Sequence, residues 1–196
     1  NHGDNMKYIR VIFSLLFFFA FEAKASNCSD CNAPPYSGDT WVDLNVPNTN
    51  CSISLRYQHR TYQCNGETIY ELKVTGWVAF IDQTCPWLDD PATTVETAIS
   101  LLLSNPNKTP FIIPPDGDCI DTYSVEGAGC WYPDEGTGPK GYGTYWYACD
   151  NSDVCCKPYT VCKDGDEITV SPGTYDPVDC TGQYGDNGRA CQPICP

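Results

Sequence analysis

Histidine and basic side chains are scarce in this sequence. Its 196 residues include two histidines and 11 lysines and arginines, against 25 aspartates and glutamates, so the formal net charge is −14. A surface with this excess of negative charge repels nucleic acid and anionic lipid. The charge therefore argues against a nucleic-acid partner and against binding to anionic membrane surfaces.

The sequence also lacks the motifs that mark common enzyme classes. It contains no G-x-S-x-G elbow, no H-E-x-x-H motif, no P-loop and no dinucleotide fingerprint. His59 continues the apolar face of a predicted strand, which favours a packed histidine over a general base. Paired carboxylates can hydrolyse glycosides, and Asp89, Asp90, Asp134 and Glu135 lie close to aromatic residues in the sequence. We expect a non-enzymatic protein without a cofactor, and keep a small secreted hydrolase as the second alternative.

Long apolar runs are missing except near the N-terminus. Lys7 and Arg10 precede an apolar run over residues 11–21, and an A-x-A sequence at 23–25 follows it. A basic start, a short apolar run and A-x-A are typical of a secretory signal, and the run is shorter than the about 20 residues that span a bilayer. We predict that residues 1–25 are upstream residues and a cleaved signal peptide. The mature protein is then secreted or at the cell surface, without membrane contact.

Cysteine, in contrast, is abundant. An even number of cysteines, 14, in a chain with an export signal predicts a disulfide framework. Two pairs have zinc-like spacing, but oxidised sulfur does not bind zinc, so we predict no metal site. The cysteines predicted to form disulfides are Cys28, Cys31, Cys51, Cys64, Cys85, Cys119, Cys130, Cys149, Cys155, Cys156, Cys162, Cys180, Cys191 and Cys195.

Alternation of apolar and polar residues predicts strands in the first half of the mature chain. It occurs over residues 40–46 and 52–58, and again in a return segment that begins at residue 68. Asn65-Gly66 lies before the return segment, and this dipeptide favours a tight hairpin turn because both residues tolerate positive φ. We also predict a short apolar strand over residues 111–115.

One segment has the pattern of an amphipathic helix. Asp90 is placed as the N-cap and Pro91 at the first helical position, and Asn105-Pro106 marks the end. The apolar residues between them recur at helical spacing, namely Val95, Ala98, Ile99, Leu102 and Leu103.

The predicted fold class is mainly β: a disulfide-stapled antiparallel sheet or sandwich, one amphipathic helix at about 91–104 and a cysteine-rich C-terminal lobe. We assign 26–50 to an N-terminal tail with a possible donor strand and 51–118 to a β-hairpin and helix core. Residues 119–196 form the cysteine-rich β lobe, within one domain with 51–118. A second hairpin turn is predicted at residues 163–166.

Part of the C-terminal region has a resemblance to a group of proteins. Trp146, Tyr147 and Cys149 are followed by the run Cys155–Cys162, which contains three cysteines, and by the final run Cys191–Cys195. This order resembles the C-terminal part of uncharacterised secreted cysteine-rich bacterial proteins. The resemblance implies export and disulfide bonds, and it implies no activity.

An aromatic stretch over residues 131–147 suggests a contact surface. Aromatic side chains around a Gly-rich turn either stack on sugar rings or a partner, or compensate for a small core, and both explanations stay open. A carbohydrate-binding module is therefore the first alternative function, with extracellular glycans as ligands. The candidate contact residues are Trp131, Tyr132, Tyr142, Tyr145, Trp146 and Tyr147. Asn27, Asn50 and Asn107 each begin a possible glycosylation sequon.

The preferred interpretation is a secreted structural or adhesive protein. An N-terminal strand isolated by prolines can pair with its own sheet or with the sheet of a neighbouring copy. We expect Trp41, Val42, Leu44 and Val46 to form such an assembly strand. A contact of this kind that does not close on itself builds a fibre, so the expected partner is the chain itself.

Overall fold

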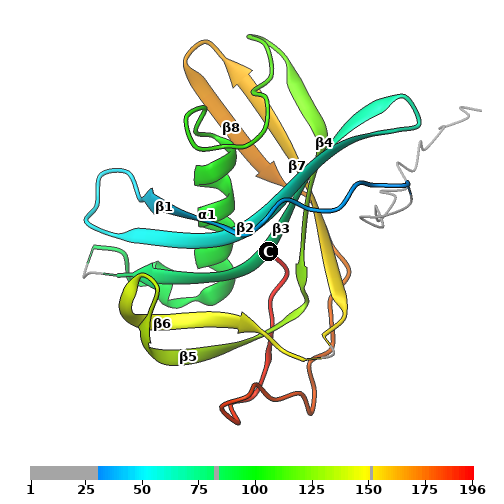
Figure 1. Cartoon of the computed structure of the whole chain (residues 1–196). Coiled ribbons are helices and arrows are strands. Elements are labelled where there is room, and N and C mark those ends of the chain that lie inside the picture. The colour runs from blue at the N-terminus through cyan, green and yellow to red at the C-terminus, as the bar shows by residue number, and fades with distance from the viewer. Residues whose placement is uncertain (1–30, 82–83, 151) are drawn as a thin grey trace, which may run out of the picture.

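The computed structural model describes residues 31–81, 84–150 and 152–196, and the predicted signal peptide lies outside these ranges. In the described residues the fold is mainly β with one α-helix, as predicted (Figure 1). The elements are β1 Thr40–Asn45, β2 Ser52–Cys64, β3 Glu67–Phe80, η1 Pro86–Asp89, α1 Pro91–Leu103, β4 Cys119–Ala128, β5 Cys130–Gly138, β6 Gly141–Ala148, β7 Val154–Asp164, β8 Glu167–Pro172 and β9 Gln192–Pro193.

The described strands form a single sheet that branches at β3. One side of β3 pairs with β2, which in turn pairs with β1. The other side pairs with β4 through residues 70–73 and with β6 through residues 77–78. One branch continues to β7 and β8, and the other continues to β5 and β9. The β3–β4 pair is parallel and is the exception to the predicted antiparallel sheet, because α1 lies in the long connection that a parallel pair requires.

Both predicted hairpin turns are confirmed. Asn65 and Gly66 join β2 to β3 with φ angles of 51° and 90°. These positive angles match the type of turn that fits the twist of a two-residue hairpin. Gly165, with φ of 58°, lies in the turn between β7 and β8.

The predicted helix is also confirmed, with its cap. The Asp90 carboxylate accepts hydrogen bonds from the Thr93 backbone N–H at 2.8 Å and from the Thr93 hydroxyl at 2.6 Å. These bonds hold the pKa of Asp90 below its ordinary value. Pro91 occupies the first turn, where its missing N–H costs no hydrogen bond. The predicted apolar face of α1 is buried against one side of the sheet.

The main core joins residues from both halves of the chain. Leu55 and Leu72 pack in the same cluster as Val125 and Tyr159. At the branch point the Trp77 ring lies 4.5 Å from the Trp131 ring between centroids. The two regions distinguished in the sequence therefore share one core.

Residues 111–115 do not form the predicted strand. Pro114 and Pro115 lack the N–H that a strand ladder uses. Phe111 is instead buried edge-on against Tyr70 and Tyr123, with ring centroids 5.6 and 5.7 Å away. The apolar residues thus serve the core without pairing in the sheet.

Disulfide bonds connect the cysteines across the fold, as predicted. No cysteine among the described residues is free. Cys156 is also disulfide-bonded, and Cys28 lies outside the described residues. The bonds between described cysteines are Cys31–Cys64, Cys51–Cys85, Cys119–Cys162, Cys130–Cys180, Cys149–Cys191 and Cys155–Cys195.

Candidate functional site

The aromatic residues proposed as a contact surface mostly pack within the sheet. Trp131, Tyr132 and Tyr145 are buried. Trp146 is partly buried and stacks on Trp77, with ring centroids 5.8 Å apart and an interplanar angle of 7°. Tyr142, in contrast, is 74 % exposed.

Tyr147 completes the set, and it is partly buried in a stack on Tyr145, with centroids 6.3 Å apart. The buried Tyr145 hydroxyl donates to the Gly141 carbonyl at 2.8 Å and accepts from the Lys140 N–H at 3.0 Å. These contacts hold the turn between β5 and β6. The aromatic stretch thus contributes mainly to the fold, and of its six residues Tyr142 offers the most accessible ring.

The acidic residues near aromatic positions take part in structural contacts. Glu135 pairs with Arg189 at 3.5 Å, and Asp134 accepts a hydrogen bond from the Asn187 amide at 3.2 Å. Asp90 caps α1, as described above. Asn50 and Asn107, which begin two of the possible sequons, are exposed, whereas Asn27 lies outside the described residues.

A charged cluster lies on the face of β3 opposite Leu72 and the core. Glu71 is fully buried and pairs with Arg60. Glu126 pairs with Lys73 at 3.0 Å and accepts a hydrogen bond from the Tyr36 hydroxyl at 2.9 Å. Each buried carboxylate thus has a cationic partner, but the Glu71 Oε1 atom is buried without a hydrogen-bond partner among the described residues.

The segment before β1 closes this cluster. The Arg60 guanidinium lies 4.0 Å from the centroid of the Tyr36 ring and donates to the Pro34 carbonyl at 3.2 Å. The Cys31–Cys64 bond ties the same segment to the end of β2. The cluster therefore holds the N-terminal segment on the sheet, which is a structural role for its carboxylates.

Glu71 gives the stability of the protein a specific dependence on pH. Burial raises the pKa of Glu71 above its ordinary value of 4.5, and the ion pair with Arg60 opposes this rise only in part. Between the ordinary and the raised value, the folded chain binds more protons at Glu71 than the unfolded chain. Its contribution to stability therefore increases as pH falls through this window.

We compare the free energy of unfolding of the native protein minus that of Glu71→Gln. We expect this signed difference to be more positive at pH 5 than at pH 7. Urea unfolding at both values measures it, and groups that do not interact with Glu71 cancel in the difference. Glu67→Gln, at the exposed start of the same strand, is the control. A difference for Glu71→Gln that is equal at both pH values, or smaller at pH 5, contradicts the prediction.

The strand predicted for assembly, β1, pairs with β2 of its own chain. Leu44 and Val46 are buried in the core, and Trp41 and Val42 are half-buried. The Val46 N–H bonds the Cys51 carbonyl at 2.9 Å, and the alternation of an antiparallel ladder then directs the backbone groups of Asp43 outward.

Two lysines contact the outer edge of β1 at Asp43. The Lys108 ammonium donates to the outward Asp43 carbonyl, and Lys140 pairs with the Asp43 carboxylate at 2.9 Å. These lysines come from the segment after α1 and from the turn between β5 and β6, and charged groups or loops over an edge hinder the addition of a further strand. A second edge, at β9, has only two residues, and one of them, Pro193, has no N–H.

A further edge of the sheet, at β8, is open. On the β4 side, the Lys163 N–H donates to the Asp118 carbonyl at 3.0 Å, and the Lys163 carbonyl accepts from the Gly117 N–H at 2.9 Å. Because both backbone groups of Lys163 face β4, Lys163 makes no backbone hydrogen bond with Ile168, the residue opposite it on β8. The alternation continues along the hairpin, so the N–H and C=O groups of Ile168 and Val170 both point away from β7. No backbone group in the described part of the chain bonds these outward groups. We call these outward groups the β8 edge.

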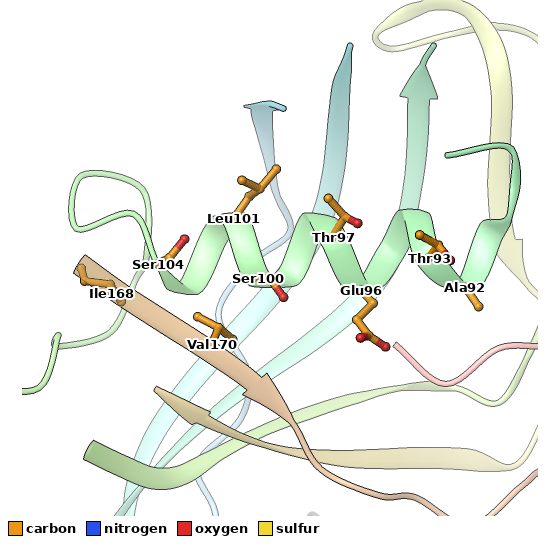
Figure 2. Close-up of a pocket in the computed structure, with 9 residues that line it drawn as sticks. All are labelled: Ala92, Thr93, Glu96, Thr97, Ser100, Leu101, Ser104, Ile168 and Val170. Carbon is orange, nitrogen blue, oxygen red and sulfur yellow. The ribbon is translucent and has the colours of Figure 1, made fainter. Parts of the chain in front are cut away.

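A groove lies between β8 and the exposed side of α1 (Figure 2). Its volume is about 430 Å³. Ile168 and Val170 line one side, and Glu96 and Ser100 line the groove from the helix. The remaining lining residues on the helix are Ala92, Thr93, Thr97, Leu101 and Ser104. We call this hollow the α1–β8 groove.

The groove is nearly neutral in spite of the acidic chain. Glu96 is its one charged lining residue, and it pairs with the buried Lys157 ammonium at 2.7 Å. Apolar side chains can therefore enter the groove beside Ile168 and Val170 without facing an uncompensated charge. The β8 edge and the α1–β8 groove together form the candidate functional site.

Sequence reasoning predicted the β7–β8 hairpin but not this site. The alternation of Ile168 and Val170 with exposed residues indicates a strand, and it does not indicate whether another strand lies beside it. The position of β8 at an edge depends on the order of strands in the sheet.

No family model, curated protein or solved structure matches the chain. The resemblance to secreted cysteine-rich bacterial proteins therefore stays a prediction. Over residues 31–81, 84–150 and 152–196 there is no helix long and apolar enough to cross a membrane. The same residues contain no group of three or more His, Cys, Asp or Glu side chains placed to hold a metal ion.

Proposed function

We propose that this protein is a secreted, non-enzymatic structural or adhesive protein that joins other polypeptide chains by strand addition at the β8 edge. In strand addition, an extended segment binds the free backbone groups of an edge strand, and neighbouring hollows receive its side chains. The observation that carries the proposal is the position of the outward Ile168 and Val170 groups beside the α1–β8 groove.

The disulfide framework supports an extracellular setting. Disulfides form and persist in oxidising environments. In this chain one joins β4 to β7, and others attach loop and terminal segments to β2, β5 and β7. The basic and apolar segment within residues 1–25 supplies the proposed export signal. Such bridges stabilise the folded state of a structural protein outside the cell.

The alternatives have less support from the described residues. Glycan binding through residues 131–147 requires exposed rings, and Trp131, Tyr132 and Tyr145 are buried. Glycoside hydrolysis requires two carboxyl groups that flank a substrate. Of the candidate carboxylates, Asp90 caps α1, and Asp134 and Glu135 contact Asn187 and Arg189. Assembly through β1 requires a free edge, and Lys108 occupies the outward Asp43 carbonyl of that edge.

Amide hydrogen exchange tests the proposal without assuming a partner. In the dilute chain, the amides of Ile168 and Val170 are expected to exchange rapidly, because they face solvent. They should become protected in concentrated protein or in material isolated from outside the cell. The amides of Thr169 and Ser171 bond β7 and should be protected in both. Rapid exchange at Ile168 and Val170 in every sample overturns the proposal.

A proline variant sharpens this test. Val170→Pro removes an outward N–H but no bond to β7, since proline is tolerated where an edge N–H faces solvent. We expect it to leave the hairpin folded and to abolish the protection of Ile168. Val170→Thr keeps the N–H and is the matched control. Protection of Ile168 that persists in Val170→Pro contradicts strand addition at this edge.

A further inference from the structure

We propose that the partner at the β8 edge is the β8 edge of a second copy of this chain, paired antiparallel about Thr169. This inference rests on the proposed function, which assigns strand addition to that edge. It follows from the pattern of hydrogen-bonding groups, side chains and charges along β8.

The backbone groups of β8 are complementary to themselves. In an antiparallel pair centred on Thr169, Ile168 lies opposite Val170 of the second copy, and Val170 lies opposite its Ile168. Both residues direct their N–H and C=O groups toward the second copy. Each of the two opposed Ile168–Val170 pairs exchanges two hydrogen bonds, so about four hydrogen bonds form. Pro172, which has no N–H, ends the pairing at each side.

The side chains of β8 are also self-complementary. Residues directly opposite each other project from the same face of a sheet. The half-buried Ile168 and Val170 of both copies therefore lie together on the face that carries α1 and its groove. The exposed Thr169 meets Thr169 of the second copy on the other face, and threonine pairs at opposed positions are favourable.

Charge decides the direction of pairing. Asp164, Asp166 and Glu167 are exposed around the hairpin turn. A parallel pair aligns the two acidic turns. The antiparallel pair separates Asp166 of the two copies by about 20 Å at 3.4 Å per residue, and Glu167 then faces Ser171. In a chain with net charge −14, this separation favours the antiparallel arrangement.

Two other edges of the sheet, at β1 and at β9, are less available than β8. Lys108 covers the outward carbonyl of β1, and β9 has two residues including Pro193. A β8–β8 contact uses the same surface on both copies, so it closes as a two-fold dimer. A fibre, if formed, requires a second contact between such dimers.

Cysteine cross-linking of the full mature chain tests the arrangement. Opposed residues that do not exchange hydrogen bonds lie about 4.5 Å apart between Cα atoms, which suits a disulfide. The chain already contains a bond of this type between β4 and β7, since Cys119 and Cys162 are opposed and their Cα atoms are 4.0 Å apart. We expect Thr169→Cys to form a covalent dimer under mild oxidation, with the bridge between the two introduced cysteines.

Two further variants test the register. Ser171→Cys is expected to give no dimer alone, because two such residues lie about 14 Å apart at 3.4 Å per residue. A mixture of Glu167→Cys and Ser171→Cys should give a heterodimer, because these positions are opposed. Non-reducing electrophoresis and mass spectrometry of the linked peptides identify the bridges and verify that the native bonds are intact.

The outcomes separate this inference from the proposed function. Adding Val170→Pro to Thr169→Cys should abolish the dimer, and added salt should increase dimer yield by screening the negative charge. Protected edge amides without a Thr169→Cys dimer overturn the second-copy arrangement and leave strand addition to a different partner. A Ser171→Cys dimer formed as readily as that of Thr169→Cys also overturns it. Unprotected edge amides overturn the proposed function itself.

Discussion

Reduction of the disulfides is expected to unfold the protein at neutral pH. Residues 173–196 contain only the two-residue β9 as regular structure. Cys180, Cys191 and Cys195 attach this segment to the sheet. One native bridge contributes about 2 to 5 kcal/mol in small secreted domains, while total stability is typically only about 5 to 15 kcal/mol. The bridges together therefore account for a large part of the stability.

The double variant Cys130→Ala/Cys180→Ala tests one bridge alone. We expect its free energy of unfolding to fall by about 2 to 5 kcal/mol, measured by urea unfolding followed by near-ultraviolet circular dichroism. Mass spectrometry under non-reducing conditions controls for reshuffling of the other bridges. A fully reduced chain that keeps its near-ultraviolet spectrum and its unfolding midpoint contradicts the prediction.

Trp77→Ala is expected to cost about 3 to 5 kcal/mol, the usual range for removing a buried large aromatic side chain. Trp77 is fully buried at the branch of the sheet, between Trp131 and Trp146. Its removal leaves a cavity where β3 meets both β2 and β6. Loss of the packing there weakens the junctions of β3 with β2 and with β6 at once.

Two variants accompany Trp77→Ala in the same urea-unfolding measurement. The Trp77 indole N–H is buried without a hydrogen-bond partner among the described residues. Trp77→Phe removes this unpaired donor while keeping a ring, so it should cost less than Trp77→Ala. Trp87, which is 48 % exposed, provides the control Trp87→Ala, with a change within about 0.5 kcal/mol. Equal costs at positions 77 and 87 contradict the assigned core.

Elements with local signals were predictable from the sequence. The Asn65-Gly66 turn follows from the positive φ that those residues tolerate, and Asp90 with Pro91 marks the start of α1 by its own capping chemistry. The strand over residues 111–115 was predicted in error, because apolar character alone does not distinguish a strand from a segment that packs Phe111 into the core.

The candidate site was outside the reach of these local signals. Ile168 and Val170 show the alternation of a strand in the sequence, yet their importance comes from the absence of a neighbour beyond β8. The sequence likewise does not distinguish Glu71 from the other residues of β3. Burial in the folded sheet raises its pKa, and the contact with Arg60 opposes that rise.

The sequence by itself determined the class of this protein: acidic, cysteine-rich, mainly β, with one capped helix and two tight hairpins. These properties depend on composition and on residues close together in the chain. The tertiary structure decided which cysteines pair, which aromatic rings are buried, how the sheet branches at β3 and which of its edges is open. Those properties depend on contacts between residues far apart in the chain, whose formation is governed by the packing of the whole core and not by any local pattern.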